Sequence, residues 1–491
     1  MNYYFLGIGG IGMSALARFF HRRGDTVSGY DRTPSPLTAE LEAEGIAIHY
    51  DDNPDLIPAE VDLVVYTPAV PTDTREFQAL VARGVKMEKR SQMLGEVTRG
   101  KKCIAVAGSH GKTTTTTMIA HLLSGINTPP PSRGGAQRAE GYPGCSAFLG
   151  GISKNFDSNL LVNADSEYVV VEADEYDRSF LQLHPHMAVI TATDPDHLDI
   201  YGTHENMMEA YLQFANQTDP DGQLFLKEGI FLTADGEEFV EYGHEHNHHH
   251  DHEEEHDHHS PFTFHLSPLT YTARGIEADY YAINVRNYNG NLFFDLRTPD
   301  GVLYDLELDG APLVNVENAV AASAVALSCG VDQFQLRSGL KSFAGVRRRF
   351  DYRIREKNIV YIDDYAHHPN EIASTIEAVR YLYPGKRVVG IFQPHLYSRT
   401  RDFADDFARV LQTLDEVIMM PIYPAREKPI LGVTSSMVLR KMETMSKYLC
   451  TPDQVLDLVP ALCPDVVLTL GAGDIDRLVP RLETVLRENM L

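Results

Sequence analysis

Seven consecutive residues near position 110 combine glycines, a lysine and hydroxyl groups in the order Gly-Ser-His-Gly-Lys-Thr-Thr. Glycine lets the backbone wrap around an anion without a side-chain clash, and the N–H groups of such a turn face phosphate oxygens. In this setting Lys112 contacts the outer phosphates of a nucleoside triphosphate, and the Thr113 hydroxyl binds Mg²⁺. Val106 stands where the usual pattern has its first glycine, so the loop is short. The residues predicted to bind ATP here are Gly108, Ser109, His110, Gly111, Lys112, Thr113 and Thr114.

Two acidic clusters follow further along the chain, and each comes directly after an apolar run. Residues 172–175 read Glu-Ala-Asp-Glu, and residues 194–199 read Asp-Pro-Asp-His-Leu-Asp. Carboxylates at the carboxyl end of strands beside a phosphate loop are placed to hold Mg²⁺ next to the γ-phosphate. We therefore expect Glu172 to be a metal ligand, and His197 to bind or orient a second metal ion.

A second glycine motif lies at the start of the chain. Residues 7–12 fit the pattern G-x-G-x-x-G, and Asp31 follows at the end of the next apolar run. This pattern places a diphosphate on a helix amino end and a ribose beside the acid, which suits either a dinucleotide or a UDP-sugar. The residues predicted to contact such a ligand are Gly9, Gly10, Ile11, Gly12, Asp31 and Thr67.

Short apolar runs alternate with stretches of helical length in three successive segments. Such alternation predicts parallel sheets covered by helices, that is, an α/β fold repeated three times. Each phosphate-binding motif lies between a strand and a helix, where the chemistry requires it. The predicted strands are residues 3–6, 26–30, 61–66, 103–107, 168–172, 187–193, 359–363, 387–392, 416–420 and 466–470.

Composition narrows the function classes. The 491 residues carry 43 basic and 69 acidic side chains, and the resulting net charge of −26 argues against general nucleic-acid or anionic-membrane binding. Five scattered cysteines form no CxxC pair, which disfavours a structural zinc site and a disulfide framework. No long apolar run or signal peptide is evident, so the sequence predicts a cytoplasmic protein.

Two stretches have the composition of loop insertions. One lies near residues 127–142 and is rich in Pro, Gly and Arg, which predicts a loop. The other, residues 244–260, carries nine histidines among acidic residues and has no apolar content with which to pack a core. A physiological metal role for this tract is the less favoured interpretation.

Taken together, the motifs resemble those of the Mur ligases of peptidoglycan synthesis. The resemblance covers nearly the whole chain. It is carried by residues 7–14 (GIGGIGMS), 108–114 (GSHGKTT), 172–177 (EADEYD), 196–199 (DHLD), 315–322 (NVENAVAA), 348–351 (RRFD), 363–371 (DDYAHHPNE), 392–402 (FQPHLYSRTRD), 423–428 (YPAREK) and 471–475 (GAGDI).

The resemblance implies an α/β fold of three domains. These are a Rossmann-like domain for the UDP-substrate at 1–99, a central P-loop ATPase-type domain at 100–327 and a Rossmann-like amino-acid domain at 328–491. It implies an ATP-dependent ligase in which the lactyl carboxylate of UDP-N-acetylmuramate is phosphorylated and the acyl phosphate is attacked by L-alanine. It also implies two Mg²⁺ ions, replaceable by Mn²⁺, and a monomer or homodimer.

Roles for further residues come from the same resemblance. Asn315 would contact adenine and Arg349 the γ-phosphate, while Lys112, Glu172, His197 and Arg349 would carry the catalysis. Because the ligands come from separate domains, closure of the domains is expected. The residues expected around the amino acid are Tyr365, His367, His395 and Arg399.

The chain departs from the family pattern at Ala192, Val314 and Leu396, where relatives usually have Asn, His and Arg. A ligase that recycles a murein tripeptide shares the chemistry and stays an alternative. An NAD-dependent oxidoreductase would explain the first glycine motif but leaves the second unexplained. A nucleotide-dependent switch without catalysis is a third alternative, which amino-acid-dependent phosphate release would exclude.

Overall fold

The computed structural model describes most of the chain. The residues it describes are 1–125, 141–195, 198–230, 232, 266–273, 278–288, 290–425 and 427–490. His197 and the histidine-rich tract at 244–260 lie outside these residues, as does nearly all of the predicted loop at 127–142. The predictions made for these three features therefore stay predictions.

The chain divides into two compact units. The first unit comprises Met1–Ile283, Asp295–Leu306 and Glu317–Ser342. The second comprises Asn284–Phe294, Glu307–Val316 and Phe343–Leu491.

The first unit begins with a five-stranded sheet in the order β3-β2-β1-β4-β5, in which every pair of neighbours is parallel. Its central strand is almost wholly buried, and the Tyr3 ring stacks on Phe20 of α1 with centroids 4.1 Å apart. The strands are β1 Asn2–Leu6, β2 Thr26–Tyr30, β3 Ala47–His49, β4 Leu63–Tyr66 and β5 Lys86–Lys89. The helices are α1 Ile11–Arg22, α2 Pro36–Ala43, η1 Pro54–Leu56, α3 Arg75–Ala82 and α4 Arg90–Thr98.

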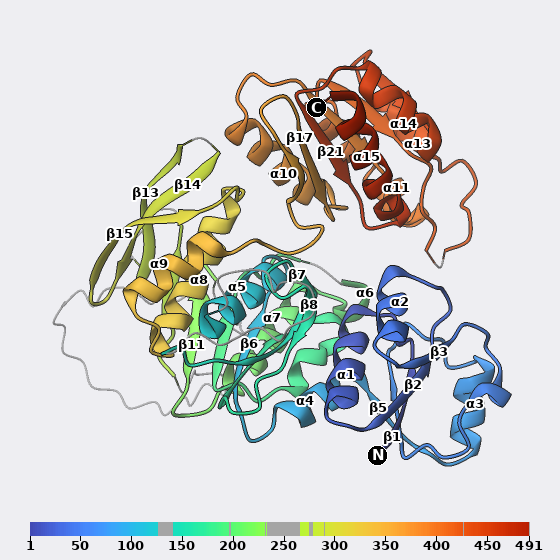
Figure 1. Ribbon diagram of the computed structural model, residues 1–491, viewed down its shortest axis with the longest axis vertical. Coiled ribbons are helices and arrows are strands. Elements are labelled where there is room, and N and C mark those ends of the chain that lie inside the picture. Colours follow the sequence, from blue (N-terminus) through green and yellow to red (C-terminus); the bar gives the residue numbers. More distant parts are fainter. Residues whose placement is uncertain are drawn as a thin grey trace, which may run out of the picture. The chain divides into compact units, whose positions relative to one another are not determined.

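A ten-stranded sheet follows, in the order β15-β14-β13-β12-β11-β10-β6-β9-β7-β8. Strands β10, β6, β9 and β7 run parallel, and their residues are apolar and buried because helices cover them, as Figure 1 shows for α5. The strands are β6 Lys102–Ala107, β7 Ser146–Ser153, β8 Ser158–Leu161, β9 Tyr168–Glu172, β10 Met187–Ile190, β11 Gln223–Lys227, β12 Leu269–Thr272, β13 Tyr280–Tyr288, β14 Asn291–Thr298 and β15 Gly301–Leu308. The helices are α5 Lys112–Ser124, η2 Tyr176–Gln182, α6 Leu198–Tyr201, α7 His204–Asn216, α8 Val314–Ser328 and α9 Gln333–Ser342.

Helix α5 is buried over most of its length although it contains five successive threonines. The hydroxyls of Thr116 and Thr117 donate to the carbonyls of Lys112 and Thr113, one turn earlier, at 2.8 and 2.7 Å. These bonds satisfy polar groups that would be costly to bury alone. The helix can therefore lie under the sheet while its first turn presents the phosphate loop.

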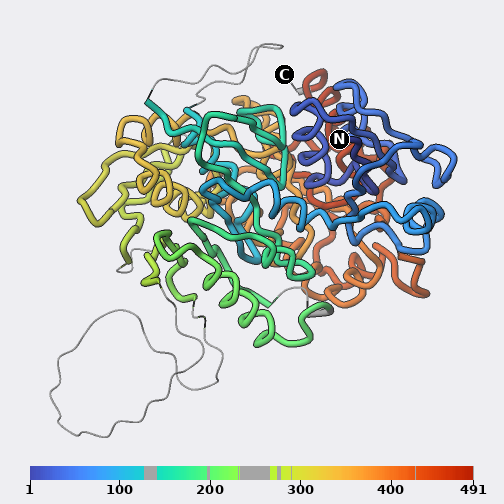
Figure 2. Tube along the Cα trace, turned by 90° about the horizontal axis from the view of Figure 1, so that it is seen from below, coloured from blue at the N-terminus to red at the C-terminus, as the bar shows by residue number. Residues whose placement is uncertain are grey.

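The second unit contains a six-stranded sheet in the order β16-β17-β21-β18-β19-β20, parallel except for β16 (Figures 1 and 2, orange to red). Its strands are β16 Asp351–Arg355, β17 Val360–Asp364, β18 Val388–Phe392, β19 Glu416–Met419, β20 Lys447–Leu449 and β21 Val466–Leu470. Its helices are α10 Pro369–Leu382, α11 Tyr397–Asp402, α12 Ala404–Leu411, α13 Ser435–Lys441, α14 Pro452–Ala461, η3 Asp474–Arg477 and α15 Val479–Met490.

All ten strands predicted from the sequence are present, three of them with the predicted bounds: β2, β9 and β21. The largest difference lies at β10, which ends at Ile190 rather than residue 193, because the chain turns there to pack against the phosphate loop. Among the described residues, no helix combines the length and apolar character needed to cross a membrane.

Candidate active site

The predicted phosphate loop connects β6 to α5. Gly108 has φ of +133° and Gly111 has φ of +82°, in the region that favours glycine. A Cβ atom on Gly108 would lie 2.2 Å from the Thr191 hydroxyl and 2.7 Å from the Ala192 nitrogen. The residues after β10 thus form the wall of the loop, and the Ser109 N–H donates to the Ala192 carbonyl at 3.0 Å.

The lysine of the loop is held by an acid from the cluster at residues 172–175. The Lys112 ammonium donates to Glu175 Oε1 at 2.8 Å and to the Gly108 carbonyl at 2.5 Å; Glu175 is buried and Lys112 is partly buried. Burial lowers the pKa of Lys112, but the charges of Glu175 and Glu172 outweigh it and leave this pKa raised. Lys112 is therefore protonated and positively charged at neutral pH, at the position where a phosphate would lie.

Glu172 ends β9 next to this loop and suits a metal ion. Its Oε2 atom is buried and has no hydrogen-bond partner among the described residues. A Cβ on Gly150 of β7 would lie 2.1 Å from that oxygen, so the carboxylate rests directly against the neighbouring strand. An unpartnered buried carboxylate oxygen is costly unless a cation binds it, and carboxylate oxygens are preferred Mg²⁺ ligands. Glu172 therefore fits the predicted metal, and the role of the Thr113 hydroxyl stays a prediction.

An amide of α8 also lies beside the loop. Asn318 Oδ1 accepts a hydrogen bond from the Thr115 hydroxyl at 3.2 Å and lies 2.8 Å from the Cβ position of Gly111. Asn318 is one helical turn after Asn315, the residue predicted to contact adenine. Sequence reasoning did not single out Asn318, although it belongs to the same NVENAVAA motif. The role of Asn315 stays a prediction.

The first glycine motif forms a tight turn at the amino end of α1. The Gly9 N–H donates to Asp31 Oδ2 at 2.8 Å, so the predicted ribose acid also braces the turn. A Cβ on Gly7 would lie 2.8 Å from the Thr67 methyl group, and one on Gly12 would lie 2.9 Å from Arg90 Nη1. The structure thus brings together residues 7–12, Asp31 and Thr67.

Arg90 links this turn to the acidic cluster, and the sequence offered no signal for it. Its Nη2 donates to Asp174 Oδ2 at 2.8 Å. Arg90, Asp174 and Glu172 line one small cavity together with residues of α4 and η2. The first unit therefore places a cation between the turn expected to bind a diphosphate and the carboxylate expected to bind the metal.

In the second unit, the residues predicted to bind an amino acid gather where β17 and β18 end. Parallel strands bring their carboxyl ends to one edge of the sheet, which explains this grouping. The His367 ring lies 5.3 Å from that of Tyr365 and 6.1 Å from that of His395, measured between centroids. Arg399 lies in the short helix α11 and its charge lowers the pKa of His367, which places it near the same group.

Burial and charge set the protonation of this group. Burial lowers the pKa of His367, and this effect exceeds the opposing one of Glu371, whose carboxylate lies 3.4 Å from Nδ1. The pKa of Glu371 is also lowered, because His367 and its backbone N–H offset the effect of burial. The result is a neutral imidazole beside a charged carboxylate.

Three consecutive arginines, at residues 347–349, precede β16. The guanidinium carbons of Arg348 and Arg349 each lie 5.2 Å from the Tyr365 ring centroid. Arg348 is tied to the sheet through Asp363 and the Gly471 carbonyl, at 3.2 and 2.6 Å. Arg349 is exposed, and its predicted contact with the γ-phosphate stays a prediction.

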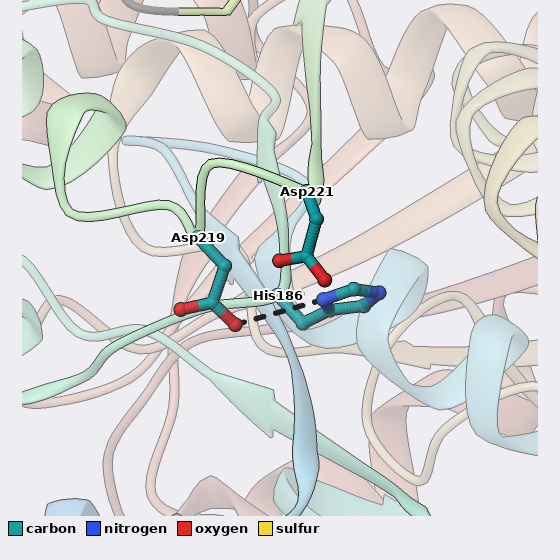
Figure 3. A group of neighbouring side chains, drawn as sticks. All are labelled: His186, Asp219 and Asp221. Carbon is teal, nitrogen blue, oxygen red and sulfur yellow. Dashed lines mark ion pairs between the residues drawn. The ribbon is translucent and has the colours of Figure 1, made fainter.

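A different set of metal-type ligands lies elsewhere in the first unit (Figure 3). Ligand atoms of His186, Asp219 and Asp221 lie within 4.8 Å of one another. These residues precede β10 and β11, whereas the phosphate loop and Glu172 follow β6 and β9. Because these strands are parallel, the two groups lie at opposite edges of the sheet, and His186 has no part in the nucleotide site.

Sequence models of three domains match this chain in order. The Mur ligase family catalytic domain matches residues 2–102, and the Mur ligase middle domain matches residues 106–326. The Mur ligase glutamate ligase domain matches residues 348–473.

This chain belongs to the Mur ligase family.

Curated relatives agree with this assignment. A UDP-N-acetylmuramate–L-alanine ligase of Parabacteroides distasonis is 46 % identical, over 98 % of this chain and 96 % of the relative. A UDP-N-acetylmuramate–L-alanine ligase of Flavobacterium johnsoniae is 41 % identical, over 100 % of this chain and 98 % of the relative. Both comparisons run through all three segments, so the relatives share the full domain set of this Mur ligase.

Solved structures show the same three-domain α/β fold. The UDP-N-acetylmuramate–alanine ligase of Thermotoga maritima has a TM-score of 0.78 at 27 % identity and covers 99 % of both chains. A murein peptide ligase of Psychrobacter arcticus has a TM-score of 0.63 at 20 % identity, over 99 % of this chain and 98 % of that one. The α/β fold predicted from the sequence is confirmed, and an NAD-dependent oxidoreductase is excluded.

Proposed function

We propose that this Mur ligase joins L-alanine to the lactyl carboxylate of UDP-N-acetylmuramate through an acyl phosphate formed from ATP, giving ADP and phosphate. The observation that carries the proposal is the phosphate loop, whose Lys112 ammonium pairs with Glu175 and is also influenced by the charge of Glu172. The buried Oε2 atom of Glu172 has no hydrogen-bond partner among the described residues. Full-length relatives at 46 % identity bear the name of this activity, which supports the same substrates here.

The reaction starts from two negatively charged partners, so charge neutralisation is the main task of the site. The loop N–H groups and Lys112 would hold the β- and γ-phosphates, and Arg349 would reach the γ-phosphate. The substrate carboxylate then attacks phosphorus, the bond to ADP breaks, and an acyl phosphate forms. The alanine amine attacks the acyl carbon, and phosphate leaves with the electron pair of the broken C–O bond.

Thr113 and Glu172 are the residues we propose to hold Mg²⁺, with His197 at a second ion. A Mg²⁺ ion held by these residues would neutralise negative charge on the phosphates. The turn at residues 9–12 would hold the diphosphate of the UDP-substrate, with Asp31 and Thr67 beside it. Arg399 would form a bidentate ion pair with the alanine carboxylate, and Tyr365, His367 and His395 would surround the amino acid.

The deciding experiment measures phosphate release from ATP with each substrate omitted in turn. Release should require both UDP-N-acetylmuramate and L-alanine, and Lys112→Ala should abolish it. Product formation with a tripeptide but not with alanine would favour the recycling ligase instead. Near-normal turnover of Lys112→Ala would contradict the assignment of the loop.

The metal proposal has a test that does not depend on turnover. In wild-type protein, Mg²⁺ should raise the melting temperature measured with a non-hydrolysable ATP analogue. Glu172→Gln should lose this rise, because a neutral amide is a poor Mg²⁺ ligand. Glu209→Gln, an exposed position on α7, serves as the control. An undiminished rise in Glu172→Gln would exclude Glu172 as the ligand.

A further inference from the structure

A buried amide connects β8 to the first turn of α1. Asn159 Nδ2 donates to the Ile11 carbonyl at 2.6 Å and to the Ser14 hydroxyl at 2.9 Å. Its Oδ1 accepts from Arg18 Nη1 at 2.6 Å. Asn159 and Ser14 are fully buried and Arg18 is 2 % exposed. The hydrogen-bonding groups of one amide are therefore divided between the amino end of α1 and its middle.

The arginine in this network is held from its other side by the helix that follows β2. Arg18 Nε donates to Glu44 Oε1 at 2.7 Å, and Nη2 donates to Glu40 Oε2 at 2.9 Å. Each guanidinium nitrogen therefore has a partner, which a buried cation requires. Arg18 thus ties α2 and α1 to the same amide of β8.

The hairpin that carries Asn159 also touches the metal carboxylate. Strand β8 pairs antiparallel with β7, and β7 pairs with β9, which ends in Glu172. Gly150 of β7 lies directly against the Glu172 carboxylate, where no Cβ could fit. One rigid hairpin therefore contacts the γ-phosphate side of the site through Gly150 and the diphosphate side through Asn159.

We propose that Asn159 is a positioning residue for the phosphorylation step, an inference that rests on the proposed function. By fixing the first turn of α1 against the β7–β8 hairpin, it sets the distance between the bound UDP-substrate and the γ-phosphate. In-line attack needs the reacting atoms about 3–3.5 Å apart, and a misplacement of about 1 Å costs on the order of 10²-fold in rate. Asn159 acts through α1 and touches no substrate.

The test compares Asn159→Ala and Asn159→Asp with wild-type protein below their melting temperatures. Asn159→Ala should lower kcat by about 10²-fold while the KM for ATP and the Kd for UDP stay within about threefold. Asn159→Asp keeps the acceptor for Arg18 but turns an oxygen toward the Ile11 carbonyl. Asn159→Asp should lower kcat as much as Asn159→Ala does, because Arg18 keeps its partner while the first turn of α1 loses its hydrogen bonds to residue 159.

Two variants complete the design. Asn163→Ala, just after β8, should behave as wild type. Ser14→Ala removes one of the two α1 contacts with little loss of volume, so it should lower kcat by a smaller factor, even if Asn159→Ala does not fold. Unchanged kcat in the variants that fold, or recovery of kcat in Asn159→Asp, would overturn the proposal. A wild-type protein without alanine-dependent phosphate release would instead refute the proposed function.

Discussion

At the scale of single residues, the site depends on charges whose partners lie a few residues away in the sequence. Sequence reasoning placed Glu172 and Glu175 in one acidic cluster and named Glu172 as the metal ligand. In the structure, Glu175 is the partner of Lys112, while Glu172 keeps a buried oxygen without a hydrogen-bond partner among the described residues. The residue types therefore indicated the chemistry of this cluster. The different roles of Glu172 and Glu175 depend on the direction in which each side chain points from the end of β9.

His121 gives a pH-dependent prediction at this scale. It is buried in α5, with Nε2 3.0 Å from both the Gly339 carbonyl and the Ser342 hydroxyl, and burial lowers its pKa to about 4. The unfolded chain binds a proton near pH 6.5, so the free energy of unfolding should fall as pH decreases from about 6.5 to 4. The loss amounts to about 3 kcal/mol over this interval.

His121→Gln replaces the imidazole N–H with an amide N–H donor, and the amide does not titrate. Urea unfolding at pH 5.5 and 7.5 should therefore show a smaller pH dependence for this variant than for wild type. His204→Gln, a histidine on α7 for which no such burial applies, should keep the wild-type dependence. Equal slopes for His121→Gln and wild type would show that His121 does not contribute.

At the scale of elements, the phosphate loop requires a glycine for space and not only for backbone conformation. Gly108→Ala would place a Cβ 2.2 Å from the Thr191 hydroxyl, so the loop must move away from β10. ATP binding should weaken by at least about tenfold, which corresponds to a loss of about 1.4 kcal/mol. Isothermal titration with an ATP analogue measures this change.

Gly301→Ala is a matched control for that prediction. Gly301 has φ of +144°, close to the +133° of Gly108, but a Cβ there would meet no atom within 4 Å. The control carries similar backbone strain without the clash, and its nucleotide affinity should equal that of wild type. Equal weakening in both variants would attribute the effect to strain in the chain as a whole.

Helix α11, which carries Arg399, depends on an acid from another segment. Glu427 accepts the Ser398 N–H at 3.0 Å and also the Ser398 hydroxyl, and these bonds, opposing burial, lower its pKa. Leu396, the residue before the helix, has φ of +70°, a backbone conformation that leucine disfavours. The turn is therefore stabilised by its contacts with neighbouring residues.

Glu427→Gln should therefore raise the KM for L-alanine by about three- to tenfold, since hydrogen bonds to a charged group contribute about 1.5–3 kcal/mol and the amide keeps part of them. The KM for ATP should not change. Glu443→Gln, an exposed acid in the same unit, is the control. A uniform rise in every KM would indicate general destabilisation of the unit instead.

The elements themselves were largely predictable from the sequence. Strands β9 and β21 are short, largely apolar and buried runs, and both have the predicted bounds, as does the more polar strand β2. Arg90 and Asn159 could not be found, because their importance depends on which distant side chains they meet. Arg90 meets Asp174, 84 positions later, and Asn159 meets Arg18, 141 positions earlier.

At the scale of the whole molecule, the division into two compact units predicts unfolding that is not two-state. Phe214→Ala removes a ring that stacks on Phe180 at 5.0 Å in the first unit and should cost about 3–5 kcal/mol there. Val467→Ala should destabilise the second unit in the same way, because Val467 is fully buried there. Calorimetry should show each variant lowering a different transition, and a single shared transition would contradict this.

The pairing of Lys112 with Glu175 has a consequence for protons. If triphosphate draws the ammonium away, Glu175 remains in a buried position where desolvation raises its pKa. Nucleotide binding would then be accompanied by proton uptake from the buffer. Heats of binding measured in buffers with different ionisation enthalpies would differ in proportion to the protons taken up, and Glu175→Gln would remove that difference.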